Sequence, residues 1–131
     1  MWRATGAEIL TMTAAHHDDV LAVTSHLPHM LGYTLVDALL KLDDNKTMVA
    51  LAASSFRDAT RVAASDPEMW HDICLSNRAA LVKALKHYRV QLDDLLAALE
   101  RDDGGYLRAL FARAKQQRDT LAARDKERSF D

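Results

Sequence analysis

The sequence predicts an all-α domain with a kinked N-terminal helix and a long, coiled-coil-like helix. The composition is globular, with 49% hydrophobic and 27% charged residues, and only four glycines and two prolines interrupt it. Apolar residues recur at helical spacing over residues 14–42, and they alternate at spacings of four and three after Asn77. A chain of 131 residues with these features is about one domain long.

Charge, cysteine content and hydropathy exclude several classes of protein. The formal net charge of -2 gives no electrostatic reason to expect binding to nucleic acid or to an anionic membrane. The single cysteine, Cys74, excludes an intrachain disulfide and a cysteine-rich zinc module. No apolar run approaches the roughly 20 residues that a membrane span requires, and the first residues do not resemble a signal peptide. We therefore expect a cytoplasmic protein.

Residues 1–12 differ from the rest of the chain. A short apolar run at residues 9–12 follows Gly6 and is more typical of a strand than of a helix. One strand cannot stand alone. We therefore expect residues 1–12 to be a remnant of a preceding domain.

A long helix with a kink in its middle is predicted over residues 14–42. Pro28 lies within this pattern, lacks a backbone N–H and leaves the carbonyl group of Thr24 without its usual partner. The proline should kink or break the helix beside His26 and His29. Turn-forming residues end this segment, and a shorter helix is expected over residues 46–53. The apolar positions of the long helix include Leu21, Leu27, Met30, Leu31, Leu35, Ala38 and Leu39.

The second half of the chain contains a helix start and a long apolar seam. Either Ser65 caps the new helix, with Glu68 closing a capping box, or Asp66 caps it, with Pro67 at the first helical position. The longest helix begins at Asn77. A seam of its length in so small a chain predicts a helical partner, and a second copy of the chain would make a homodimer. The seam consists of Leu81, Leu85, Tyr88, Leu92, Leu95 and Leu99.

Gly104 and Gly105 are expected to terminate the long helix. A last helix is predicted over residues 106–123, and residues 124–131 form a charged tail that we expect to fray. The domain proper then spans residues 13–123. The inward-facing residues of the last helix are expected to be Leu107, Leu110, Phe111, Ala114 and Leu121.

Arg57, Arg61 and Ser65 are spaced four residues apart and would share one face of a continuous helix. Two like charges at this spacing repel each other by a few tenths of a kcal/mol unless an anion lies between them. One interpretation is a carboxylate site, because guanidinium groups bind carboxylates through two parallel hydrogen bonds and the helix start at Ser65 also favours an anion. The other is a solvated surface on which Asp58 pairs with Arg61. The spacing alone does not choose between them.

Three histidines, His17, His26 and His29, surround the predicted kink. Metal ligation is not favoured, because His17 and His26 are about half a turn out of phase and no helix supplies a second acidic ligand. We therefore expect no metal site and interpret the histidines as hydrogen-bonding or substrate-contacting groups. Trp70 is by default a core residue, and its nearness to the arginines suggests a pocket wall.

Two segments resemble the C-terminal dimerisation domain of prephenate and arogenate dehydrogenases. They read HDDVLAVTSHLPHMLGYTLV at residues 17–36 and FRDATRVAASDPEMWHDICLSNR at residues 56–78. The pairs and runs His-Asp, Ser-His-Leu-Pro-His, Phe-Arg-Asp with a later Thr-Arg, and Met-Trp form a specific signature in this order. The resemblance extends from about Trp2 to the end of the long helix and weakens after Gly105.

This resemblance implies part of an enzyme of tyrosine biosynthesis. Members of the family join an N-terminal Rossmann domain, which binds NAD or NADP, to an all-helical domain that intertwines with its twin. They oxidise prephenate with loss of carbon dioxide to 4-hydroxyphenylpyruvate, or arogenate to tyrosine. Residues 1–12 would then be a remnant strand of the nucleotide-binding domain, and residues 13–123 the substrate-binding and dimerisation domain.

The resemblance also implies roles for individual residues. Arg61 would hold a substrate carboxylate, and His29 would contact the substrate or tyrosine bound as an inhibitor. Ser65 and Trp70 would shape the pocket. Four further residues would order the site or reach the nicotinamide end of the cofactor, namely His17, Asp18, Ser25 and His26. Two would lie near the subunit interface, namely Arg57 and Asp58.

The chain departs from the family in the residues that hydride transfer requires. It contains no glycine-rich GxGxxG segment, and the family's general-base histidine is expected in the absent domain. The resemblance thus implies that this chain holds no catalytic residue, binds no NAD or NADP by itself and is inactive alone. Two alternatives stay open: a stand-alone helical dimerisation or interaction module, and, with less support, a metal-dependent phosphohydrolase suggested by the His17 and Asp18 pair.

Overall fold

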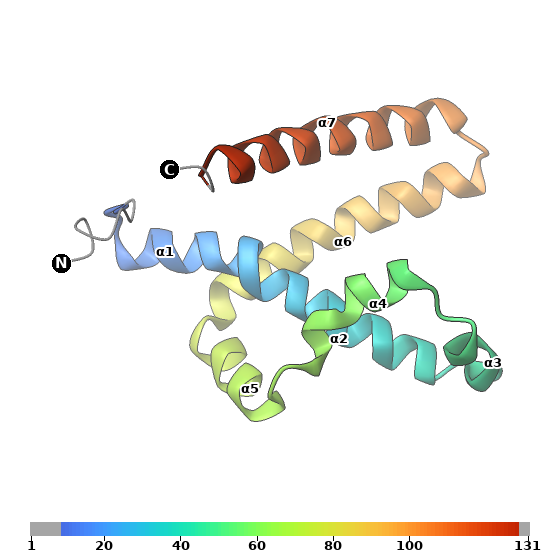
Figure 1. Cartoon of the computed structure of the whole chain (residues 1–131), viewed down its shortest axis with the longest axis horizontal. Helices are drawn as coiled ribbons and strands as arrows, with labels where there is room; N and C mark the ends of the chain where they lie inside the picture. Colours follow the sequence, from blue (N-terminus) through green and yellow to red (C-terminus); the bar gives the residue numbers. More distant parts are fainter. Residues whose placement is uncertain (1–8, 129–131) are drawn as a thin grey trace. The chain divides into compact units, whose positions relative to one another are not determined.

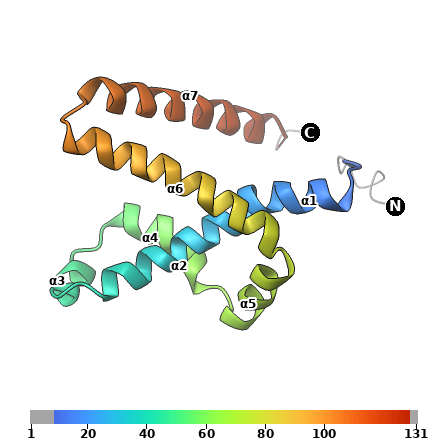
Figure 2. The same ribbon diagram turned by 180° about the vertical axis from the view of Figure 1, so that it is seen from behind.

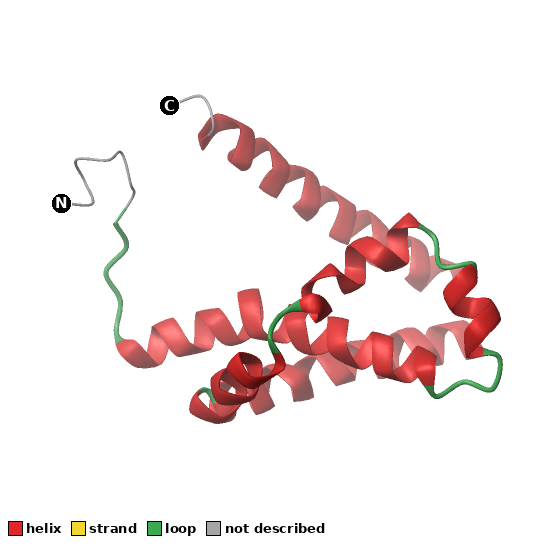
Figure 3. Cartoon of the chain, turned by 60° about the horizontal axis from the view of Figure 1, so that its bottom comes forward, coloured by secondary structure: helices red, strands yellow, loops and turns green. Residues whose placement is uncertain are grey.

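The computed structural model describes the backbone of residues 9–128 and the side chains of residues 9–123. These residues form helices joined by short turns and contain no strand (Figure 1, Figure 3). They belong to two compact units, one ending at Lys86 and one beginning at His87. The all-α prediction is therefore confirmed. No helix in the described part of the chain is both long and apolar enough to cross a bilayer.

The N-terminal helix is interrupted where the sequence predicts it. Helix α1 (Ala14–Leu21) passes into a π-helical segment (Ala22–His26), which continues into α2 (Leu27–Leu40). The interruption is a widened turn, in which the Leu27 N–H donates to the carbonyl of Ala22 five residues earlier. Pro28 follows at once, in the first turn of α2, where its missing N–H costs least.

Residues 9–12 do not form the predicted strand. Their backbone is irregular, and regular structure begins only after Thr13, whose hydroxyl caps α1 by accepting from the His16 N–H at 3.2 Å. A strand requires a partner for its backbone hydrogen bonds, and residues 9–128 supply none. Residues 1–8, the rest of the predicted remnant, lie outside the described residues.

Two short helices follow α2 and fold back on it. Helix α3 (Asn45–Ala50) leads to α4 (Ser54–Thr60), whose last turn tightens into a 3₁₀ segment (Arg61–Ala64). Both α4 and the 3₁₀ segment pack against α2, and α4 runs beside α2 in Figures 1 and 2. Gly32 permits this close approach, because a Cβ atom there would lie 2.7 Å from Cγ2 of Val62.

The helix start after the 3₁₀ segment uses the second of the two predicted caps. The Asp66 side chain accepts from the Met69 N–H at 2.8 Å, and α5 (Pro67–Ser76) begins with Pro67. Ser65 is not the cap, because it lies one residue before Asp66, and its carbonyl accepts a hydrogen bond from the Tyr33 hydroxyl at 2.8 Å. Helix α6 (Arg78–Glu100) follows, as the seam predicts.

The turn between α6 and α7 (Gly104–Arg128) differs from the predicted glycine-terminated end of the long helix. Gly104 and Gly105 begin α7 instead of ending α6. The left-handed residue of the turn is Asp102, with φ 52°, and Asp103 caps α7 by accepting from the Tyr106 N–H at 2.9 Å. Asp102 therefore takes the left-handed position that glycine usually occupies at the end of a helix.

The described residues bury a small core and expose much apolar surface. Trp70 and Leu81 are only 6% and 5% exposed, and Ala22, Leu27 and Ala84 complete the core of the first unit. In contrast, three of the six predicted seam residues are exposed: Leu85, Leu92 and Leu99 of α6 are 37%, 45% and 54% exposed. Three of the five residues expected to face inward on α7 are also exposed, namely Phe111, Ala114 and Leu121. A chain of this size normally buries more of its apolar surface.

We expect Gly32→Ala to destabilise the chain by about 1 to 2 kcal/mol. The added methyl would overlap the stiff, β-branched Val62 side chain, and the cost of overpacking exceeds the gain in helix propensity. Chemical unfolding followed by circular dichroism measures the change. Gly104→Ala is the matched control, since nothing lies within 4 Å of the added atom. Equal stability of both variants would show that α2 and the 3₁₀ segment can separate freely.

Candidate functional site

Two histidines of the N-terminal helix meet the tryptophan of α5. The rings of His29 and Trp70 are stacked, with centroids 3.7 Å apart and planes inclined by 22°. His26 meets the same tryptophan edge to face, at 5.9 Å and 80°. Three of the residues singled out from the sequence therefore form one aromatic cluster, although they come from segments some 40 residues apart.

Hydrogen bonding determines which nitrogen of His29 carries the proton. Its Nδ1 lies 2.9 Å from the carbonyl oxygen of Ser25, which can only accept. Nδ1 therefore donates, and Nε2 of the neutral ring keeps its lone pair. The ring is only partly buried, so Nε2 can accept a hydrogen bond from a ligand, or donate one after protonation.

A residue that the sequence analysis did not single out, Asn77, completes the cluster. Its amide nitrogen lies 2.8 Å from the carbonyl oxygen of Asp18 and 3.2 Å from Nδ1 of His26. The sequence did contain one indication of this role, an asparagine between two predicted helices, because asparagine side chains in turns commonly form hydrogen bonds with nearby backbone groups. Its partners come from a helix more than 50 residues earlier, which local patterns do not reveal.

Burial disfavours the charged form of His26. The side chain is only 8% exposed, and desolvation lowers the pKa of His26 below its ordinary value of 6.5. Nearby His29 and His17 lower the pKa further, while the carboxylate of Asp18 opposes the shift. His17 and Asp18 themselves lie on the surface, where His17 Nδ1 and Asp18 Oδ1 are 3.2 Å apart.

The arginines do not occupy one regular helical face. Arg57 lies in α4, Arg61 lies in the 3₁₀ segment, and Ser65 lies beyond it in extended backbone. A spacing of four residues therefore does not place the three side chains on one helical face. The predicted pairing of Asp58 with Arg61 is not among the ion pairs of residues 9–123. Both arginines are exposed. The helix start after Ser65 is also partly satisfied, because Asp66 already accepts its Met69 N–H.

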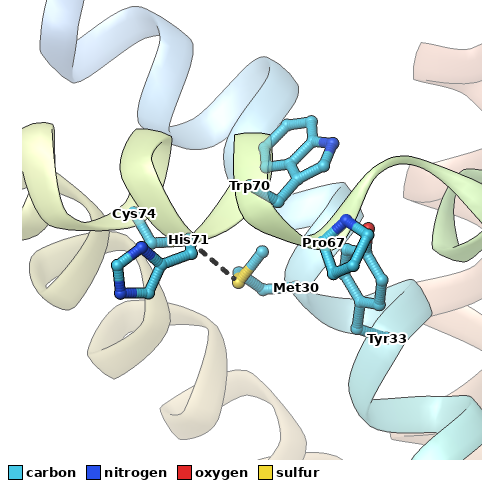
Figure 4. Close-up of a pocket in the computed structure, with 6 residues that line it drawn as sticks. All are labelled: Met30, Tyr33, Pro67, Trp70, His71 and Cys74. Carbon is cyan, nitrogen blue, oxygen red and sulfur yellow. Dashed lines mark hydrogen bonds between the residues drawn. The ribbon is translucent and has the colours of Figure 1, made fainter.

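An apolar pocket of about 260 Å³ lies on α2 and α5 (Figure 4). Within it, Cys74 Sγ donates to Met30 Sδ at 3.4 Å, and burial raises the pKa of the Cys74 thiol. The thiol is therefore a protonated, apolar group in the wall of the pocket. The lining residues are Met30, Tyr33, Pro67, Trp70, His71 and Cys74.

One group of side chains in the described residues has the spacing of metal ligands. Glu68, His71 and Asp72 hold their ligand atoms within 4.8 Å of one another on α5. All three are exposed, and His71 Nδ1 already lies 2.9 Å from Asp72 Oδ1. The group does not include His17, His26 or His29, so the histidines at the π-helical segment are not brought together as a metal centre.

Residues 13–113 match the family model described as "Prephenate dehydrogenase, dimerization domain". The chain is 42% identical over 119 residues to the cyclohexadienyl dehydrogenase of Zymomonas mobilis, which covers 89% of this chain and 41% of that protein. It is 34% identical over 125 residues to the prephenate dehydrogenase of Bacillus subtilis, covering 95% of this chain and 34% of that protein. The chain therefore spans well under half the length of these relatives.

Solved structures agree in fold. The arogenate dehydrogenase of Synechocystis superposes with a TM-score of 0.86 at 33% identity, covering 91% of this chain and 44% of that one. The prephenate dehydrogenase of A. aeolicus, in complex with hydroxyphenyl propionate and NAD+, gives a TM-score of 0.85 at 31% identity. The match covers 92% of this chain and 42% of that structure's chain.

We expect the free energy of unfolding to fall as the pH drops below about 6.5. Between the lowered pKa of His26 and 6.5, the unfolded chain binds more protons at this residue than the folded chain does, so acid favours unfolding. Urea unfolding at pH 7.5 and 5.5 measures the change. It should be smaller in His26→Gln than in the wild type, and unaltered in a control at an exposed histidine, His87→Gln. The same change in all three proteins would contradict a neutral, buried His26.

Proposed function

This chain belongs to the prephenate dehydrogenase family through its dimerisation domain, and we propose that it supplies the substrate-contacting wall and the dimer interface of such an enzyme. The reaction proposed for the whole enzyme is the NAD-dependent or NADP-dependent oxidative decarboxylation of prephenate to 4-hydroxyphenylpyruvate, or the oxidation of arogenate to tyrosine. The stacked pair of His29 and Trp70 carries the proposal, because it offers a flat apolar surface beside a free imidazole nitrogen. The family match favours this reading over the phosphohydrolase alternative and over a module without a catalytic partner.

The ligand chemistry fits the residues at the wall. Prephenate and arogenate each combine a six-membered ring, a hydroxyl group and carboxylates. In our proposal, Arg61 binds a carboxylate, His29 Nε2 bonds to a polar group of the substrate, and Trp70 and Ser65 shape the pocket. Arg61 is exposed, and the 3₁₀ segment that carries it packs against α2, the helix of His29. Tyrosine also combines a six-membered ring, a hydroxyl group and a carboxylate, and it would compete at this wall.

The remaining residues of the family motif receive proposed roles from their positions in that motif. We propose that His17, Asp18, Ser25 and His26 order the site on the side that meets the cofactor domain, and that Arg57 and Asp58 lie near the subunit interface. The described residues do not themselves fit NAD or NADP: they form helices with short connecting segments and lack the strand and glycine-rich turn that cradle a pyrophosphate. No step through the nicotinamide is therefore assigned to this chain.

Homodimerisation is supported by exposed apolar surface on α6. Leu85, Leu92 and Leu99 follow the seam spacing, yet each is substantially exposed. In the second unit, a gap of about 550 Å³ lies where Gln91 of α6 faces α7, and it is wide enough to accept side chains from a partner. A second copy of the chain would cover this surface, as expected for a dimerisation domain.

We expect the chain to have a molar mass in solution near twice 14.6 kDa. Leu92→Asp should shift the mass toward one chain, because a carboxylate placed in an apolar interface loses its hydration without gaining a partner. Light scattering after size exclusion measures both masses. Asp94→Lys is the control, since residue 94 lies on the opposite side of α6. A monomeric wild type would overturn the interface assignment.

In the full-length enzyme, Arg61→Ala should weaken prephenate binding by about 2 to 5 kcal/mol, since a carboxylate enclosed between the domains would lose its bidentate partner. Arg61→Lys should recover part of the loss, because it keeps the charge without the fork geometry. Calorimetric titration with prephenate measures the affinity. Arg108→Ala, at an exposed arginine of α7, is the control. Unchanged affinity in Arg61→Ala would remove Arg61 from the site.

A further inference from the structure

Asn77 joins three helices through one side chain. It lies between α5 and α6, where its own N–H donates to the Ile73 carbonyl and ends α5. Its amide nitrogen reaches the Asp18 carbonyl oxygen at 2.8 Å and Nδ1 of His26 at 3.2 Å. One side chain thus links the α5–α6 junction to both α1 and the π-helical segment.

The two contacts determine the direction of both hydrogen bonds. A backbone carbonyl can only accept, so the group of Asn77 that faces Asp18 must be its NH2 group. The same NH2 group faces Nδ1 of His26, which must therefore accept the second hydrogen. Flipping the amide would place its oxygen against the Asp18 carbonyl, so that bond would be lost, and the bond with His26 would require the opposite tautomer, protonated at Nδ1.

We propose that Asn77 is a positioning residue, which holds His26 in the neutral tautomer protonated at Nε2 and thereby maintains the His26, Trp70 and His29 ring cluster. A ring whose Nδ1 is held by a fixed donor cannot rotate or gain a second proton without losing that bond. The edge of His26 then stays against Trp70 at 5.9 Å, and Trp70 keeps the face on which His29 stacks. The importance of Asn77 for substrate contact rests on the proposed function.

The charged groups around His26 do not replace this restraint. His17 and Asp18 of α1 and His29 of α2 act on His26 through space, with opposing signs. Lys83 of α6 lies 3.8 Å from Asp19, at the surface, and forms an ion pair there. Among the described residues, the hydrogen bond to His26 comes from Asn77. The two histidines consequently have opposite tautomers: Nε2–H in His26 and Nδ1–H in His29.

Nitrogen-15 NMR of the histidine rings tests the proposal on the 131-residue chain. In the wild type at pH 7.5, His26 should show an unprotonated Nδ1 and a protonated Nε2, while His29 shows the reverse. Asn77→Ala should give His26 a mixture of tautomers and reduce the ring-current shift of His29 protons by Trp70. Asn77→Asp offers His26 an acceptor, so it should favour Nδ1–H and shift the pKa of His26 upward.

Asn45→Ala is the matched control, because the amide of Asn45 also donates to a backbone carbonyl, that of Leu40, at 2.9 Å, without contacting a histidine. It should leave both tautomers unchanged. A wild-type His26 protonated at Nδ1 would overturn the proposal, and so would an unchanged tautomer in folded Asn77→Ala. If Asn77→Ala does not fold, the wild-type tautomer and Asn77→Asp still decide. These readouts involve no substrate, so a failure to bind prephenate would count against the proposed function alone.

Discussion

The widened turn at Ala22–His26 is the constraint on which the site depends. Here the Leu27 N–H donates to a carbonyl five residues earlier, and Pro28 follows with no N–H to donate. The regular pattern of α-helical hydrogen bonds is therefore interrupted over a short stretch. Side chains add hydrogen bonds around this stretch: the Thr24 hydroxyl donates to the Val20 carbonyl at 2.8 Å, and Asn77 donates to the Asp18 carbonyl. The interruption also allows two consecutive residues, His26 and Leu27, to be buried together. Such π-helical turns are frequent at functional sites.

The site is held from two sides of this helix. On one side, α5 supplies Trp70, and Asn77 connects the end of α5 to the turn. On another, the 3₁₀ segment lies against α2 at Gly32, and the Tyr33 hydroxyl holds the carbonyl of Ser65. Neither contact is strong alone, since one hydrogen bond contributes about 1 kcal/mol. Together they determine where the arginine segment runs relative to the histidines.

The exposed apolar surface gives the domain its second property. The buried core is small, whereas α6 presents a row of leucines and α7 exposes Phe111 and Leu121. Exposing apolar surface of this kind to water is unfavourable, and covering it with another surface lowers the free energy. The same domain therefore combines a polar, histidine-rich wall with a broad apolar surface, which are the two features that a subunit needs to bind a ligand and to pair with its twin.

The sequence by itself determined the helical class, the interruption near Pro28, the Asp66 and Pro67 helix start as one of two options, and the family signature, because these depend on local periodicity, capping and motif order. It misplaced Gly104 and Gly105, since a turn ended by an Asp103 cap and a left-handed Asp102 needs no glycine. The shared face of Arg57, Arg61 and Ser65 was conditional on one continuous helix, which the 3₁₀ segment breaks. Only the tertiary structure brought Trp70 against His26 and His29 and identified Asn77, because those contacts join residues that local patterns treat as independent.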